Sequence, residues 1–352
     1  MLRSYEPGRF GSFATETAPF AMHILSGLSN DHAHQLNAPG AYEWWYADAL
    51  DAGGEWGVVM ILFRGMPMSP DYLAEARSMT GGYALSVYYR GVRIAFAFGG
   101  HPLQECRFDV SQPGVSMPSG ALECDPEGIS MHVDAPCGTD GRRARVNLRM
   151  TKDTAPLVPS ETHTEGHAWV LASARTRAQV SIEIDEAHGP VVRHDFAGIA
   201  YHDHNMGSRA MPMDYHDWYW GRCHGRDATY VFLLTRRSVD NVTWFGRVTS
   251  DGRVEELDEV SIKFSRRRIS MLGLIHHRRI RLRGRDRSGH VHEVICSNDT
   301  VCEDGPFYQR YISSWRINGD ESALGTSEYM NVQRLAQPWI RPFLRLPWMV
   351  SS

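Results

Sequence analysis

The 352-residue sequence contains no uninterrupted apolar run of the roughly 18 residues that a membrane-spanning helix needs. Its N-terminus also lacks the basic region and apolar run of a signal peptide, so we expect a cytoplasmic location. None of the six cysteines forms a CxxC pair, and their spacing fits neither a zinc ribbon nor a dense disulfide framework. We therefore expect free thiols in a reducing compartment.

Recognised cofactor motifs are missing as well. The sequence has no GxGxxG fingerprint, no P-loop and no nucleophile elbow, so we expect no cofactor. The net charge of −4 lacks the basic footprint of a nucleic-acid-binding protein. One segment differs, because ten Lys or Arg and a single acid, Asp286, lie between Lys263 and Arg287. We interpret it as a solvated strand face, with a patch for phosphate or an anionic membrane as the alternative.

Tryptophan and glycine are abundant by contrast, with 10 Trp and 32 Gly. Short aromatic and β-branched runs are separated by Gly, Pro and Asp, and no long helical period is present. Residues 83–89 and 92–98, joined by Arg90 and Gly91, are typical of a β-hairpin. This pattern predicts an all-β chain of barrels or sandwiches.

The length favours two domains. We expect an irregular lead-in over residues 1–40, a first barrel over 41–188, and a second barrel with a docking tail over 189–352. One short helix is expected at residues 69–79. The apolar tail at 338–348 is expected to dock on a barrel as a lid, with peripheral membrane contact as the alternative.

Residues 42–48 (YEWWYAD) form a first candidate site. Side chains alternate between the faces of a strand, so one face would carry Tyr42, Trp44, Tyr46 and Asp48, and the other Glu43 and Trp45. A carboxyl group among such rings has a pKa raised by desolvation and can act as an acid. In the alternative, the aromatics only fill a core and the acids make structural hydrogen bonds.

Residues 201–207 (YHDHNMG) form a second candidate site. His202 and His204 would share one strand face, and Tyr201, Asp203 and Asn205 the other. An HxH pair is a possible metal fragment, but no third ligand has a diagnostic spacing, so we expect no metal. We expect instead a polar network that holds acid–base groups, and a purely structural network remains the alternative.

Residues 217–222 (DWYWGR) form a third candidate site. Trp218 and Trp220 would face the same side, and Gly221 allows another backbone to approach closely. Arg222 is expected to pair with Asp203 or another buried acid, because a buried charge needs a partner. The alternative is that Arg222 bridges strands and that the tryptophan pair is core.

With these segments in view, the chain resembles the carotenoid 1,2-hydratase (hydroxyneurosporene synthase) family. The matching pieces keep the family's order over nearly the whole chain, at residues 40–46, 69–72, 167–169, 198–207, 218–222, 305–310 and 339–347. The resemblance implies two packed lipocalin-like antiparallel β-barrels with an apolar ligand at or near their interface. It also implies cofactor-free addition of water to a terminal isoprenoid double bond.

The sequence departs from the family pattern at two places. By this resemblance, hydratases of the family carry Trp at the position of Met206. They also place a carboxylate in the strand that follows the WxWGR-like segment. Here residues 229–235 (TYVFLLT) contain no acid. Related two-barrel proteins include pericyclases (Diels–Alderases), which work mainly by folding a polyene.

Our first hypothesis is a hydro-lyase. Asp203 protonates an alkene, with Glu43 and Asp48 as reserve acids, and His204 or Tyr201 holds the water. The cation is stabilised by nearby indoles. The second hypothesis is a pericyclase or isomerase, in which Arg222 polarises a carbonyl, and the third is a non-catalytic carrier. In each case the partner is an apolar small molecule, and the expected binding residues are Tyr42, Trp44, Tyr46, Met206, Trp218 and Trp220.

Overall fold

The computed structural model describes residues 22–34, 36, 38–68, 80–138, 141–151, 166–185, 191–237 and 240–340. The expected helix at 69–79, the residues around 188 and the tail beyond Ile340 lie outside this part of the chain. Strands dominate the described residues, and all six cysteines are free. The helical elements that accompany them are short 3-10 turns: η1 (Leu28–Asn30), η2 (Leu103–Glu105), η3 (Met211–Met213), η4 (Val332–Ala336) and η5 (Pro338–Ile340).

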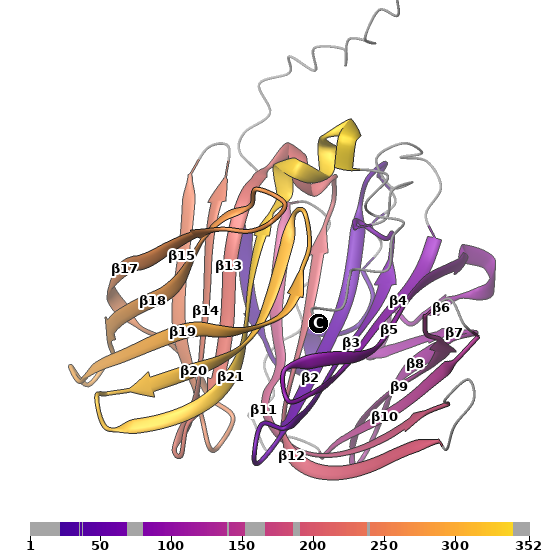
Figure 1. Ribbon diagram of the computed structural model, residues 1–352, viewed down its shortest axis with the longest axis horizontal. Helices are drawn as coiled ribbons and strands as arrows, with labels where there is room; N and C mark the ends of the chain where they lie inside the picture. The colour runs from indigo at the N-terminus through magenta and orange to yellow at the C-terminus, as the bar shows by residue number, and fades with distance from the viewer. Residues whose placement is uncertain are drawn as a thin grey trace, which may run out of the picture.

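The strands form two curled sheets that pack side by side (Figure 1). The first has 12 strands in the order β5-β4-β3-β2-β12-β11-β10-β9-β8-β7-β6, with β1 added on β11. Its members are β1 (Met22–Ser26), β2 (Tyr42–Asp51), β3 (Trp56–Arg64), β4 (Thr80–Tyr89), β5 (Val92–Pro102), β6 (Arg107–Phe108), β7 (Gly114–Met117), β8 (Gly120–Asp125), β9 (Gly128–Pro136), β10 (Arg143–Thr151), β11 (His167–Ile184) and β12 (Val192–Gly207).

The second sheet has nine strands in the order β16-β15-β14-β13-β21-β20-β19-β18-β17. Its members are β13 (Tyr215–His224), β14 (Ala228–Arg237), β15 (Asn241–Thr249), β16 (Val254–Glu256), β17 (Asp258–Ile269), β18 (Ile275–Arg285), β19 (Val291–Asp304), β20 (Tyr308–Ile317) and β21 (Glu321–Asn331). The two curled sheets confirm the predicted all-β class with two lipocalin-like antiparallel units. The hairpin of β4 and β5 turns at Arg90 and Gly91, both with positive φ.

Two expected boundaries need correction. The lead-in is not wholly irregular, because β1 runs parallel to the first residues of β11, beyond the end of β10. The first sheet also continues past residue 188, since β12 pairs with both β11 and β2 through Gly207. The chain therefore passes from the first sheet to the second between Gly207 and Tyr215.

Strand alternation places most of the buried side chains in three layers. Trp45 and Ala47 face the interior of the first sheet, and Phe232 and Trp315 face the interior of the second. A third cluster joins the sheets and includes Trp44 from β2 and Trp220 from β13. The layer between the sheets is the most aromatic part of the core, and the candidate site lies in it.

Candidate active site

Two adjoining cavities of about 70 and 270 Å³ lie between the sheets. They share lining residues from β2, β13 and β21: Trp44, Tyr46, Trp218 and Glu328. The smaller cavity is also lined by Tyr42, Trp169, Asp203, Asn205, Trp220 and Leu233, among others. We call the two cavities together the chamber. Seven of the 15 residues that line the smaller cavity are aromatic, and Asp203, an acid of the same lining, is only 4% exposed.

Asp203 lies on the wall of the chamber that the first sheet forms. Its register partner on β2 is Tyr46, and paired residues of neighbouring strands share a face, which directs Asp203 toward the second sheet. Its Oδ2 accepts hydrogen bonds from Trp169 Nε1 at 2.7 Å and Tyr201 Oη at 2.8 Å, and Asn205 Nδ2 donates to Oδ1 at 2.9 Å. Burial raises the pKa of Asp203 from 3.8 to about 7, although the Trp169 and Tyr201 donors favour the charged form.

Aromatic rings surround this carboxyl group. Tyr201, which donates to it, lies 5.3 Å from Trp220 between ring centroids, and Tyr46 meets the same indole edge-on at 5.4 Å. Tyr42 stacks on Trp44 at 5.0 Å. These rings come from both sheets, and their π-faces are suited to stabilising a cation that forms between them.

Glu328 contributes a second buried carboxyl group, from the opposite sheet. It pairs with Trp220 in register and lines both cavities. Burial raises the pKa of Glu328 above its ordinary value, against the effect of Arg310, whose Nε and Nη2 lie 3.0 and 2.9 Å from Glu328 Oε1. The charge of Glu328 in turn contributes to the raised pKa of Asp203.

Arg310 also ties the larger cavity to the first sheet. Its Nη1 lies 3.1 Å from Oε1 of Glu303, which also accepts a hydrogen bond from Ser86 at 2.7 Å. Burial opposes the charge of Glu303, but Arg310 and Arg93 outweigh it and lower the pKa of this carboxyl. The larger cavity therefore has one ionic wall, while Val59, Ile61, Phe63, Phe96 and Phe98 give it an apolar one.

Arg222 does not pair with Asp203. It forms a fully buried ion pair with Asp48 of the first sheet, and Tyr46 Oη donates to the same carboxylate at 2.7 Å. Neither Arg222 nor Asp48 lines the chamber. Because Asp48 pairs in register with Tyr201, its carboxylate lies two residues along the strand pair from Asp203 and closer to Arg222. The pair joins the two sheets outside the chamber, so the expected catalytic roles of Arg222 and Asp48 do not fit this arrangement.

Glu43, His204 and Met206 also fall outside the chamber, because they occupy the other face of β2 and β12. His204 stacks on Trp45 with ring centroids 4.3 Å apart, and Met206 belongs to a separate apolar cluster with Val170. Strand alternation places Asp203 and His204 on opposite faces, so His204 cannot hold a water molecule beside Asp203. The expected roles of these three residues at the site are therefore wrong.

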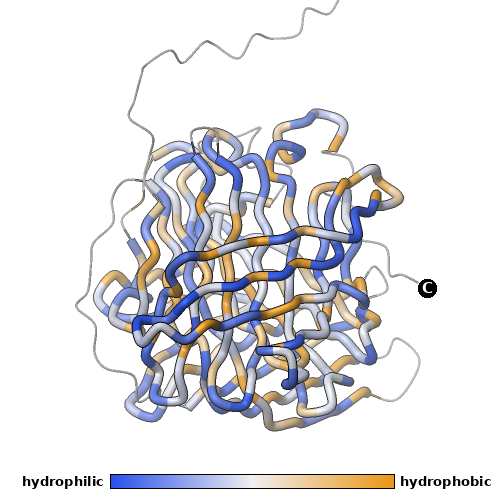
Figure 2. The backbone as a smooth tube through the Cα atoms, turned by 90° about the vertical axis from the view of Figure 1, so that its left-hand side faces the viewer, coloured by the Kyte–Doolittle hydropathy of each residue, from blue (hydrophilic) through white to orange (hydrophobic). Residues whose placement is uncertain are grey.

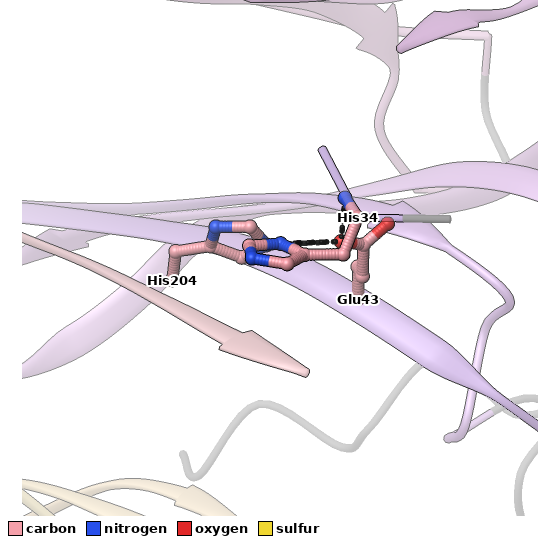
Figure 3. A group of neighbouring side chains, drawn as sticks. All are labelled: His34, Glu43 and His204. Atoms are coloured by element: carbon pink, nitrogen blue, oxygen red, sulfur yellow. Dashed lines mark hydrogen bonds and ion pairs between the residues drawn. The ribbon is translucent and has the colours of Figure 1, made fainter. Parts of the chain in front are cut away.

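Glu43 and His204 instead meet His34 in a buried cluster (Figure 3). Glu43 Oε1 lies 3.3 Å from His34 Nδ1 and 3.6 Å from His204 Nε2, and it accepts the His34 backbone N–H at 2.6 Å. Burial opposes the charge of Glu43, but the bonds from His204 and His34 outweigh it and lower its pKa to about 2. Burial lowers the pKa of His204.

This cluster is the one group within the described residues with the donor types and closeness to hold a metal ion, since its ligand atoms lie within 4.8 Å of one another. Within the cluster, His34 and Glu43 lie beside His204 of the HxH segment. The other histidine of that segment, His202, lies outside the cluster and pairs with Asp31 at 2.9 Å. Arg64 Nη1 already neutralises Glu43 from 3.1 Å. We assign the cluster a structural role, in which it ties residues 31–34 to β2 and β12.

Sequence reasoning missed three groups at the site: Trp169, Glu328 and Arg310. Trp169 and Arg310 lie in segments that resemble the hydratase family, so the sequence contained a signal for them. Glu328 lies in a strand of ordinary composition, and its position becomes evident only when β21 pairs with β13. The expected residues that line the chamber are Asp203, Tyr42, Trp44, Tyr46, Trp218 and Trp220.

Comparison with known proteins identifies the family. Residues 136–349 match the family model for the carotenoid hydratase CrtC. This chain belongs to the CrtC carotenoid hydratase family. A hydroxyneurosporene dehydrogenase of Chlorobaculum tepidum is 27% identical over 342 residues, covering 88% of this chain and 87% of the relative. An acyclic carotenoid 1,2-hydratase of Thiocapsa roseopersicina is 26% identical over 322 residues, covering 88% of this chain and 73% of the relative.

Solved structures share the fold of this CrtC-family chain at low sequence identity. A CghA structure with Sch210972 has a TM-score of 0.57 and 12% identity, covering 88% of this chain and 96% of that one. An AttH protein of Nitrosomonas europaea has a TM-score of 0.56 and 15% identity, covering 86% and 94%. Within the described part of the chain, no helix has the length and apolar character needed to cross a membrane.

Proposed function

We propose that this protein is a cofactor-independent hydratase that adds water across an isolated C=C bond of an acyclic isoprenoid or polyene. The observation that supports the proposal most is the buried carboxyl group of Asp203 on the wall of an aromatic chamber. Membership of the carotenoid hydratase family supports an apolar polyene as substrate.

The first step is protonation of the alkene. The O–H bond of the Asp203 carboxyl group breaks, and the π electron pair of the substrate forms a new C–H bond with that proton. A tertiary carbocation and the Asp203 carboxylate result. The N–H of Trp169 and the hydroxyl of Tyr201 stabilise the carboxylate, since both donate to its Oδ2. The π-faces of Trp44 and Trp220 stabilise the cation.

The second step is capture of the cation by water. An oxygen lone pair of water forms the C–O bond, and the proton that this water releases returns to the Asp203 carboxylate, which restores the acid. Asn205 and Glu328 line the same cavity as Asp203 and orient the water molecule. In this scheme Glu328 and Asn205 take the role that the sequence analysis gave to His204 or Tyr201, and the hydroxyl of Tyr201 donates to Asp203 instead.

The chamber is too small for a whole extended carotenoid and suits one end of it. The cavity of about 70 Å³ next to Asp203 admits the reacting group. The adjoining cavity of about 270 Å³ offers Val59, Ile61 and Phe63 to the chain behind that group. The structure therefore favours a terminal double bond over an internal one.

Incubation of the purified protein with acyclic carotenoids, followed by mass spectrometry, tests the proposal. The wild type should give a product heavier by one water, and Asp203→Asn should reduce the formation of this product by about 10²–10⁴-fold. Asp195→Asn is the matched control, because Asp195 is an exposed acid on the same strand. Full hydration by Asp203→Asn would contradict the proposal. An isomer of unchanged mass would favour a pericyclase, and an unchanged bound ligand would favour a carrier.

A further inference from the structure

Exposed apolar side chains gather at one hairpin of the second sheet. Twelve large hydrophobic residues are exposed among those the structure describes, and five of them lie within residues 264–275, on β17, β18 and the turn between them. Met271 at the tip is 95% exposed, and Ile269 is 67% exposed. The others of this group, which we call the hairpin tip, are Phe264, Leu272 and Ile275.

A sixth exposed residue belongs to the same area. Trp339 is 50% exposed, and the guanidinium carbon of Arg334 lies 5.7 Å from the centre of its ring. Arg334 also donates to the backbone carbonyls of Leu272 and Gly273, at 2.9 and 2.6 Å. An exposed indole therefore lies beside the hairpin tip, held there by a residue that also fixes the turn.

Cationic side chains flank the hairpin tip. Arg267 and Arg268 precede Ile269, and both are exposed. Neither forms an ion pair with an acid of the described residues, whereas Arg281 and Arg285 farther along β18 pair with Glu293 and Glu259. In Figure 2 the strands of this side face the viewer, with hydrophilic and hydrophobic segments alternating along them. The uncompensated positive charge is thus next to the apolar tip.

The hairpin tip is connected to the chamber through two neighbouring residues of η4. Gln333 donates to the backbone carbonyl of Tyr215 at 2.7 Å, and Tyr215 lines the cavity that contains Asp203. Arg334, the next residue, holds the turn of the hairpin tip. This side of the molecule therefore carries both the exposed apolar residues and an edge of the chamber.

From these observations we propose that the hairpin tip, with Trp339, docks on the surface of an anionic lipid bilayer. A projecting apolar turn suits insertion at the headgroup level, and an indole suits the membrane interface. Arg267 and Arg268 would lie at the level of the lipid phosphates, where each basic residue adds favourable binding energy. The exposure and charge of these residues carry the inference, and it does not depend on the reaction in the chamber.

Sedimentation with vesicles tests this proposal. The full-length protein should bind mixed vesicles of phosphatidylcholine and phosphatidylglycerol. It should bind vesicles of phosphatidylcholine alone far more weakly. Arg267→Gln with Arg268→Gln should weaken binding roughly tenfold or more. Met271→Asp should also weaken it, whereas Val110→Asp, at a residue that is 51% exposed in the connection between β6 and β7, should not.

Two results would overturn the proposal. One is equal vesicle binding by the wild type and Met271→Asp. The other is concentration-dependent self-association without lipid that Met271→Asp abolishes, which would assign the hairpin tip to a second copy of the chain. Asp203→Asn should bind vesicles like the wild type, so a failure of the proposed reaction and a failure of docking can be told apart.

Discussion

Trp169 donates its indole N–H to Oδ2 of Asp203 at 2.7 Å, from one strand of the first sheet to the next. This bond favours the charged form of a carboxyl group whose pKa burial has raised to about 7. The pair therefore sets how readily Asp203 gives up its proton inside the chamber.

Trp169→Phe removes this donor and should raise the pKa of Asp203 further. The pH above which hydration declines should move to higher values, measured as kcat/KM against pH. Trp244→Phe is the control, because Trp244 packs edge-on against Trp169 at 5.3 Å without bonding to Asp203. An unchanged profile for Trp169→Phe would show that the bond has no influence on the acid.

Glu328→Gln should shift the same profile in the opposite direction. The charge of Glu328 contributes to the raised pKa of Asp203, so its removal should lower that pKa and move the decline in hydration to lower pH. The rate should also fall, since the water loses a partner. A shift to higher pH in this variant would contradict the assigned arrangement of the two carboxyl groups.

Asp203→Asn should reduce hydration by about 10²–10⁴-fold, the usual contribution of a general acid. It should also make unfolding less sensitive to pH. The raised pKa means that the folded protein keeps its proton between 3.8 and about 7 while the unfolded chain loses it, so the wild type becomes less stable as pH rises through this range.

Across that window the free energy of unfolding of the wild type should fall by about 1.4 kcal/mol per pH unit relative to that of Asp203→Asn. Above the window the difference between the two proteins should stay constant. Urea unfolding at a series of pH values measures the difference. The exposed Asp195→Asn should instead follow the wild type throughout. A wild type that instead loses stability relative to Asp203→Asn as pH falls would mean that Asp203 is stabilised as a carboxylate in the folded protein.

Arg222→Met should destabilise the protein by about 3–5 kcal/mol, because it leaves the Asp48 carboxylate buried without its partner. Asp48→Leu combined with Arg222→Met should recover much of this loss, since no buried charge remains. Arg90→Ala, which breaks an exposed pair with Glu55, should cost at most about 1 kcal/mol. Denaturant unfolding measures the loss of stability in each of the three variants. Equal losses for Arg222→Met and Arg90→Ala would show that the buried pair stabilises the fold no more than an exposed one.

Local sequence patterns predicted many of the strands and the chamber-facing aromatics, because strand alternation depends only on neighbouring residues. The same alternation places His204 opposite to Asp203, so its assignment to the water was an error of interpretation and not of pattern. Glu328 and the Arg222–Asp48 pair could not be predicted, because they depend on how the second sheet is positioned on the first. The strand β11 was not predicted, and its small residues at 172–174 carry little strand signal.

Asp203 comes from one sheet, and Trp220, which lines the same cavity, comes from the other. A small rotation of one sheet against the other would change the distance from acid to alkene without altering any residue of the chamber. Substitutions in the contact layer, at residues such as Asp48 that do not line the chamber, would therefore change its shape from outside.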